Sequence, residues 1–131
     1  MLVSILFYMV LYQTKGQIED AIAKRVIEFY VSTLGTGPRE AKVHIIEDMV
    51  IVRTYGKLLP IEEQLLGGDQ GVELVKTIRK AFHEINTKKL RSMIEEITGH
   101  KVVSSHADVS TKTGEKFEAF ILETNFENEL K

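Results

Sequence analysis

The hydrophobic residues of this chain change period along its length, and this change limits the folds open to it more than any other feature. Over residues 17–34 the period is that of an amphipathic helix, with apolar side chains at Ile18, Ile22, Val26, Phe29 and Tyr30. The helix should end near Gly35, which can take a left-handed backbone, and before Pro38, which cannot continue a helix. We expect the first element to be a helix over residues 17–34.

A β-hairpin is expected next, because residues 41–46 and 49–55 are rich in strand-forming side chains and only Glu47 and Asp48 separate them. Pro60 can then open a short helix over 60–66. A longer helical pattern follows the glycines of 67–71, where we expect Asp69 to cap the helix. It covers 72–98, with two apolar stripes: Val75, Ile78, Phe82 and Ile85, then Leu90, Met93, Ile94 and Ile97. The offset between the stripes predicts a kink or a rotated buried face at Asn86-Thr87.

A second hairpin is expected over residues 101–110 and 116–124, with Gly114 supplying a positive φ in its turn. The order is then helix, hairpin, short helix, long helix, hairpin. Two such halves most simply share one four-stranded antiparallel sheet covered on one face by the helices, a two-layer α+β fold. The other face is left for solvent or for a second copy. We assign residues 17–125 to a single domain, 1–16 to an apolar N-terminal extension and 126–131 to an acidic tail.

Composition excludes several classes of function. A formal charge of −2 gives none of the basic excess that nucleic-acid backbones attract, so no nucleic-acid partner is expected. The chain has no cysteine, which removes disulfides, thiolate nucleophiles and cysteine-based zinc sites and fits a cytoplasmic location. We expect no cofactor.

The first 12 residues carry no charge. A helix that spans a bilayer needs about 20 apolar residues, and a signal peptide would have a basic start and a cleavage site. Two interpretations remain: the segment packs on the body or on a second copy, or it anchors the chain at a membrane surface. Together with the free edges of the expected sheet, it favours a homodimer.

Ser104, His106 and Asp108 alternate along an expected strand and so share one face, with Cα atoms about 6.5–7 Å apart. This spacing is long for a catalytic relay, and neither a nucleophile elbow nor an oxyanion loop accompanies it. The other histidines lie in other elements, without metal-ligand spacing. The sequence therefore predicts no catalytic residue and no metal site.

The turn after this strand has more polar side chains than one tight turn needs for its own hydrogen bonds. It is the best candidate for contact with a partner or a small anion. The candidate residues are His106, Asp108, Ser110, Thr111, Lys112, Thr113, Gly114 and Glu115.

Several of these motifs resemble one known family. They are Gly35-Thr36-Gly37-Pro38, residues 49–52 leading to 56–62, Ile97-Thr98-Gly99 and, most specifically, His106 to Glu115. They resemble the MpsC-like family of small bacterial proteins, over residues 15–124. The resemblance implies a soluble accessory component of a sodium-translocating, membrane-potential-generating system, cytoplasmic or peripheral to the inner face of the membrane, beside integral-membrane transport proteins. The family supplies no catalytic residues, so no enzyme activity is expected. The alternative is a domain that binds a small anion or other small ligand, with or without enzymatic activity of its own.

Overall fold

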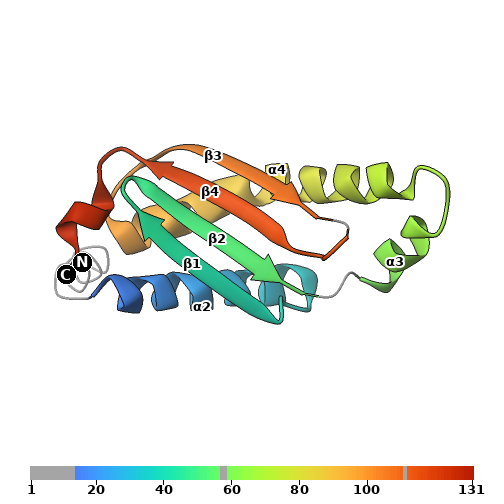
Figure 1. Cartoon of the computed structure of the whole chain (residues 1–131), viewed down its shortest axis with the longest axis horizontal. Coiled ribbons are helices and arrows are strands. Elements are labelled where there is room, and N and C mark those ends of the chain that lie inside the picture. The colour runs from blue at the N-terminus through green and yellow to red at the C-terminus, as the bar shows by residue number, and fades with distance from the viewer. Residues whose placement is uncertain (1–13, 57–58, 111) are drawn as a thin grey trace.

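The computed structural model describes residues 14–56, 59–110 and 112–131. The elements run α2 (Lys15–Leu34), β1 (Glu40–Ile46), β2 (Met49–Tyr55), α3 (Pro60–Leu66), α4 (Gly71–Thr98), β3 (Val102–Val109), β4 (Lys116–Leu122) and a 3-10 helix, η1 (Phe126–Glu129). The expected two-layer α+β fold is confirmed: one antiparallel sheet of order β1-β2-β4-β3 lies over α2 and α4 (Figure 1). The expectations for residues 1–12 lie outside the described residues.

The N-terminal ends of α2 and α4 differ from the sequence-based expectation. α2 begins at Lys15 because Thr14 and Gln17 form a capping box, each side chain hydrogen-bonded to the other's backbone N–H. Its C-terminus is as expected, with Gly35 at φ 78°. The expectation for Asp69 was wrong: Gln70 precedes α4, in a left-handed conformation without a side-chain cap.

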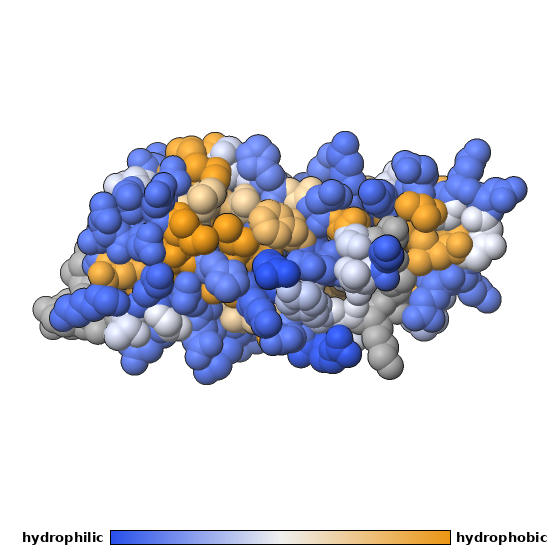
Figure 2. All heavy atoms as spheres, in the orientation of Figure 1, coloured by the Kyte–Doolittle hydropathy of each residue, from blue (hydrophilic) through white to orange (hydrophobic). Residues whose placement is uncertain are grey.

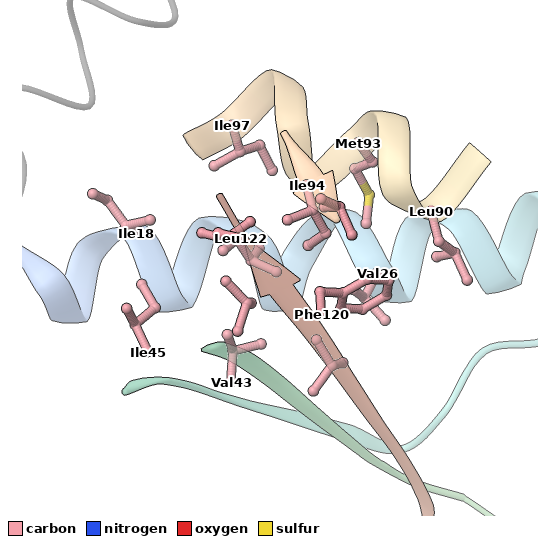
Figure 3. Close-up of a cluster of buried hydrophobic side chains, with 14 of the residues drawn as sticks. Ile18, Val26, Val43, Ile45, Leu90, Met93, Ile94, Ile97, Phe120 and Leu122 are labelled. Carbon is pink, nitrogen blue, oxygen red and sulfur yellow. The ribbon is translucent and has the colours of Figure 1, made fainter. Parts of the chain in front are cut away.

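The core lies between the sheet and the two long helices. Inward side chains of α2, such as Ile18 and Val26, meet Val43 and Ile45 of β1 and Phe120 and Leu122 of β4 (Figure 3). The second half of α4 closes the core with Leu90, Met93, Ile94 and Ile97. This stripe is the one expected from the sequence.

The first predicted stripe of α4 was partly wrong. Val75 is buried, but Ile78 is 50% exposed and Ile85 is 77% exposed. The helix continues without interruption through Asn86, which is itself buried. Counting back from Leu90 in steps of three and four gives Asn86, His83 and Arg79. Polar residues therefore hold inward positions that the sequence analysis gave to isoleucine.

The C-terminal residues are part of the same core. Phe126 of η1 is fully buried, although it lies in the segment that the sequence analysis gave as an acidic tail. The backbone N–H of Glu127 donates to the carbonyl of Glu47, which ties η1 to the β1–β2 turn. Lys15 also pairs with Glu127 at 3.1 Å.

The sheet face away from the helices is uncovered within the part of the chain that the structure describes. The strand pairing places Ile51 of β2 beside His44 of β1 and Ala119 of β4 on this face. The cross-strand pairs on either side of this one place Met49, Ile121 and Phe117 on the same face. Lys42, Arg53 and Asp108 lie toward its rim. We call this surface the open sheet face, and its apolar part is visible in Figure 2.

Candidate functional site

At one end of the molecule the inward stripes of four elements change from apolar to polar. On α2 the series Ile18, Ile22 and Val26 continues to Tyr30. On β2 the buried series Val50 and Val52 continues to Thr54. On β4 the series Leu122 and Phe120 continues to Glu118 and Lys116, and on α4 it continues to His83 and Arg79. Because these elements pack together, the polar ends meet inside the fold.

Four of these side chains form a connected set, here called the buried polar cluster: Tyr30, His83, Lys116 and Glu118. Lys116 Nζ donates to the Tyr30 hydroxyl at 2.7 Å, and that hydroxyl donates to Glu118 Oε1 at 2.8 Å. Lys116 Nζ also lies 3.4 Å from Glu118 Oε1. Two charged residues of β4 thus share one tyrosine.

His83 completes the cluster from α4. Its Nδ1 lies 3.3 Å from Glu118 Oε2, but the contact lacks hydrogen-bond geometry, and neither atom has a hydrogen-bond partner among the described residues. The contact is an ion pair only when the imidazole is protonated.

The environment sets the ionisation of the cluster. Burial opposes the charge on Glu118, yet the contacts with His83, Lys116 and Tyr30 hold its pKa below the ordinary value. Burial lowers the pKa of Lys116, against the effect of Glu118. Burial and the neighbouring Glu118 raise the pKa of Tyr30, so the hydroxyl stays protonated. Glu118 therefore remains an acceptor and Tyr30 a donor at neutral pH.

A second ion pair, between buried Glu62 and half-buried Arg79, joins α3 to α4. Arg79 Nε and Nη2 donate to the two carboxylate oxygens of Glu62 at 2.6 and 2.7 Å. Glu62 Oε1 also accepts from the backbone N–H of Leu59. Burial opposes the charge of this carboxylate, but these donors hold its pKa below the ordinary value.

Two hollows reach the cluster, and Arg79 and Lys116 line both. One, of about 380 Å³, lies between α4 and the β3–β4 hairpin and is here called the α4–β3 hollow. The other, of about 730 Å³, lies between the ends of α2 and α3 and is also lined by Tyr30 and Phe82. Both volumes fall in the range of small-molecule sites, about 300–1,000 Å³. Lys116 therefore borders both hollows, although its side chain is largely buried.

The predicted candidate residues lie outside this cluster. His106 and Asp108 project from the open sheet face, as the alternation with Ser104 predicts; a bulge between Val102 and Ser104 sets this phase. The Asp108 carboxylate accepts from the Val109 N–H. Of the predicted candidates among the described residues, Asp108 also borders the α4–β3 hollow, although its carboxylate lies on the opposite face of the sheet.

The turn itself uses most of its remaining polar groups. Ser110 Oγ accepts from the N–H of Thr113, and Thr113 Oγ1 accepts from the N–H of Glu115. Glu115 pairs with Arg53 at 2.8 Å, and Lys112 is exposed. Gly114 has φ 78°, as expected. Thr111 lies outside the described residues, and elsewhere in the described chain no three His, Asp or Glu side chains group as metal ligands.

The sequence analysis missed Tyr30, Arg79, His83, Lys116 and Glu118 as a site. A signal was present in the stretch Lys116-Phe117-Glu118-Ala119-Phe120-Ile121-Leu122, where two charged residues fall in phase with buried Phe120 and Leu122. A charged residue in the inward phase of a central strand needs a partner.

A two-layer α+β domain with a polar cluster buried at one end defines the class of protein. No solved structure matches the chain. A family model described as "Na+-translocating membrane potential-generating system (MpsC)" matches residues 14–124, and the chain belongs to this family. It is also 35% identical over 119 residues to "Uncharacterized protein YbcI" of Bacillus subtilis (strain 168), a match that covers 91% of this chain and 96% of that protein. None of the described helices is long and apolar enough to cross a membrane.

Proposed function

We propose that the chain is a non-catalytic accessory component of a Na⁺-translocating, membrane-potential-generating system. It would act in the cytoplasm, at the inner face of the membrane, beside integral-membrane transport proteins. The family description supports this role, since it names the system to which such proteins are assigned.

The single structural observation that carries the proposal is the open sheet face. Helices cover one side of the sheet, and the other side presents half-buried Ile51 and Ile121 and exposed Phe117, with charged residues at the rim. An apolar centre with a polar rim is typical of a protein interface. This surface gives an accessory component a means of assembly.

The occupant that fits this face best is a second copy of the chain. A two-fold axis parallel to the strands places β1 of one copy over β3 of the other. One row across the sheet runs Lys42, Arg53, Phe117, Asp108 in spatial order. Reversing this row sets Lys42 over Asp108 and Arg53 over Phe117, so opposite charges meet at the rim and a guanidinium meets an aromatic ring. The accessory component is then a homodimer.

The function is tested in cells that lack the chain, by recording membrane potential with a voltage-sensitive dye at high and low Na⁺. We expect loss of the Na⁺-dependent part of the potential and its recovery when the wild-type chain is restored. Ile51→Glu, which places a charge in the centre of the open sheet face, should not restore it.

Ile85→Glu is the matched control, because Ile85 is 77% exposed on α4, away from the sheet. It should restore the potential as the wild type does. Equal melting temperatures of both purified variants would separate loss of contact from loss of fold. An unchanged Na⁺-dependent potential in cells without the chain would refute the role.

A further inference from the structure

An aromatic pair joins α2 to α4 at the larger hollow, here called the α2–α3 hollow. The rings of Tyr30 and Phe82, which both line it, stack with their centroids 6.2 Å apart, and Lys116 Nζ lies 5.1 and 5.9 Å from them. One helical turn beyond each ring, Leu34 of α2 and Ile78 of α4 line the same hollow and are 45% and 50% exposed. The hollow therefore has an apolar wall on each helix, with the aromatic pair between them.

Other elements extend this apolar lining. Pro38, before β1, and Leu59 and Pro60, at the start of α3, contribute further side chains. Thr54 and Lys116 line the hollow from the inward face of the sheet, so it lies on the helix side, away from the open sheet face. A concave, mostly apolar surface with a few polar groups is typical of a small-molecule site.

The two most buried cations of the hollow are already neutralised. Arg79 donates to both carboxylate oxygens of Glu62, and Lys116 Nζ lies 3.4 Å from Glu118 Oε1. An anion in the hollow would have to compete with these carboxylates. The lining therefore favours a ligand without charge.

Hydrogen-bond donors nevertheless remain at this site. A guanidinium has five N–H donors, and the pairing with Glu62 uses only Nε and Nη2 of Arg79. Arg39 and Glu63 also line the hollow, but both are exposed and their charges are opposite. A neutral oxygen can accept from Arg79 without displacing Glu62.

We propose that the α2–α3 hollow binds a neutral small molecule that has a ring system and a carbonyl oxygen. The ring system packs between the two apolar walls and against the aromatic pair, where flat rings gain large contact areas. The carbonyl oxygen accepts a hydrogen bond from Arg79. This site is separate from the open sheet face and does not depend on the proposed role in ion transport.

Three probes with one ring system test the ligand chemistry: naphthyl methyl ketone, which is neutral, naphthoate, which is an anion, and ethylnaphthalene, which has no oxygen. Each is titrated into the full chain while backbone amide signals are followed by NMR. The ketone should shift Gly37 and Gly114, which line the hollow, in a saturable way and leave Gly16 of α2 unchanged. The other two probes should bind about tenfold more weakly, the loss expected for one hydrogen bond to a charged group.

Variants distinguish this hollow from general attraction to apolar surface. Ile78→Glu and Leu34→Glu, one in each helix wall, should each weaken binding of the ketone about tenfold or more, because a carboxylate replaces an apolar contact. Ile85→Glu is the matched control, since Ile85 lies two turns further along α4, outside the hollow, and is 77% exposed. Leu34→Glu keeps the test valid if Ile78→Glu fails to fold.

Three results would overturn the proposal. The first is the absence of a saturable shift of Gly37 and Gly114 with the ketone. The second is binding of naphthoate or ethylnaphthalene as tight as that of the ketone. The third is equal weakening by Ile85→Glu.

Discussion

At the scale of single residues, Lys116 shows why the buried polar cluster was not predicted. Its neighbours in sequence belong to a polar turn, so its charge suggests solvent. In the structure it is only 8% exposed, because β4 is a central strand and Lys116 shares the inward phase of Phe120. The partner of such an inward polar residue comes from an element distant in sequence, here Tyr30 of α2. Strand periodicity predicts direction, but it cannot supply that partner.

Gly114 is a residue whose backbone predicts a measurable loss of stability. Its φ is 78°, and a Cβ there would lie 2.6 Å from the carbonyl oxygen of Gly56. Gly114→Ala should therefore lower the free energy of unfolding by about 2 kcal/mol, measured by urea denaturation. Gly16→Ala is the control, because a Cβ at Gly16 meets nothing within 4 Å and alanine favours a helix. Equal losses in the two variants would contradict this explanation.

At the scale of elements, the sequence predicted most of the fold because the evidence was local. Strand and helix periods, with Pro60 and Gly35, predicted the bounds of the elements to within a residue or two. The errors came from contacts between elements. Ile78 and Ile85 repeat with Val75 in sequence, but the face that packs on the sheet contains Arg79 and His83. Their partners, Glu62 and Glu118, lie on α3 and β4.

The pairing of α3 with α4 predicts a dependence of stability on pH. The folded-state pKa of Glu62 is lower than its ordinary value of 4.5, mainly because the Arg79 and Leu59 donors outweigh burial. A carboxylate with a lowered pKa stabilises the fold fully above its unfolded-state pKa and loses this contribution as the pH falls through the folded-state value. The free energy of unfolding, measured in urea at successive pH values, should fall as the pH drops below 4.5.

Glu62→Gln should reduce this dependence and lower stability at neutral pH, since Arg79 loses a charged partner inside the fold. Glu63→Gln changes an exposed carboxylate of the same helix and should leave the profile close to that of the wild type. If the two variants gave the same profile, the Glu62–Arg79 pair would not be the source.

At the scale of the whole molecule, the one-sided sheet predicts the homodimer. Light scattering should give twice the mass of the chain for the wild type and a single-chain mass for Ile51→Glu, because a buried charge opposes face-to-face packing. Ile85→Glu should remain a dimer. A wild-type chain that is monomeric at all concentrations would refute the homodimer. If Ile51→Glu then still failed to restore the membrane potential, the open sheet face would instead contact another subunit of the system.

The order of the strands also has a consequence for how fast the chain folds. The β1–β2 and β3–β4 pairs join neighbours in sequence, whereas the β2–β4 seam pairs Met49 with Ile121, on either side of α3 and α4. Closing a long loop costs entropy before the contacts that it allows can form, so this central seam should be the slow step. Two hairpins that have already formed would then pair along β2 and β4 in the middle of the sheet. A substitution that weakens the β2–β4 contact would therefore slow refolding more than an equal weakening within either hairpin.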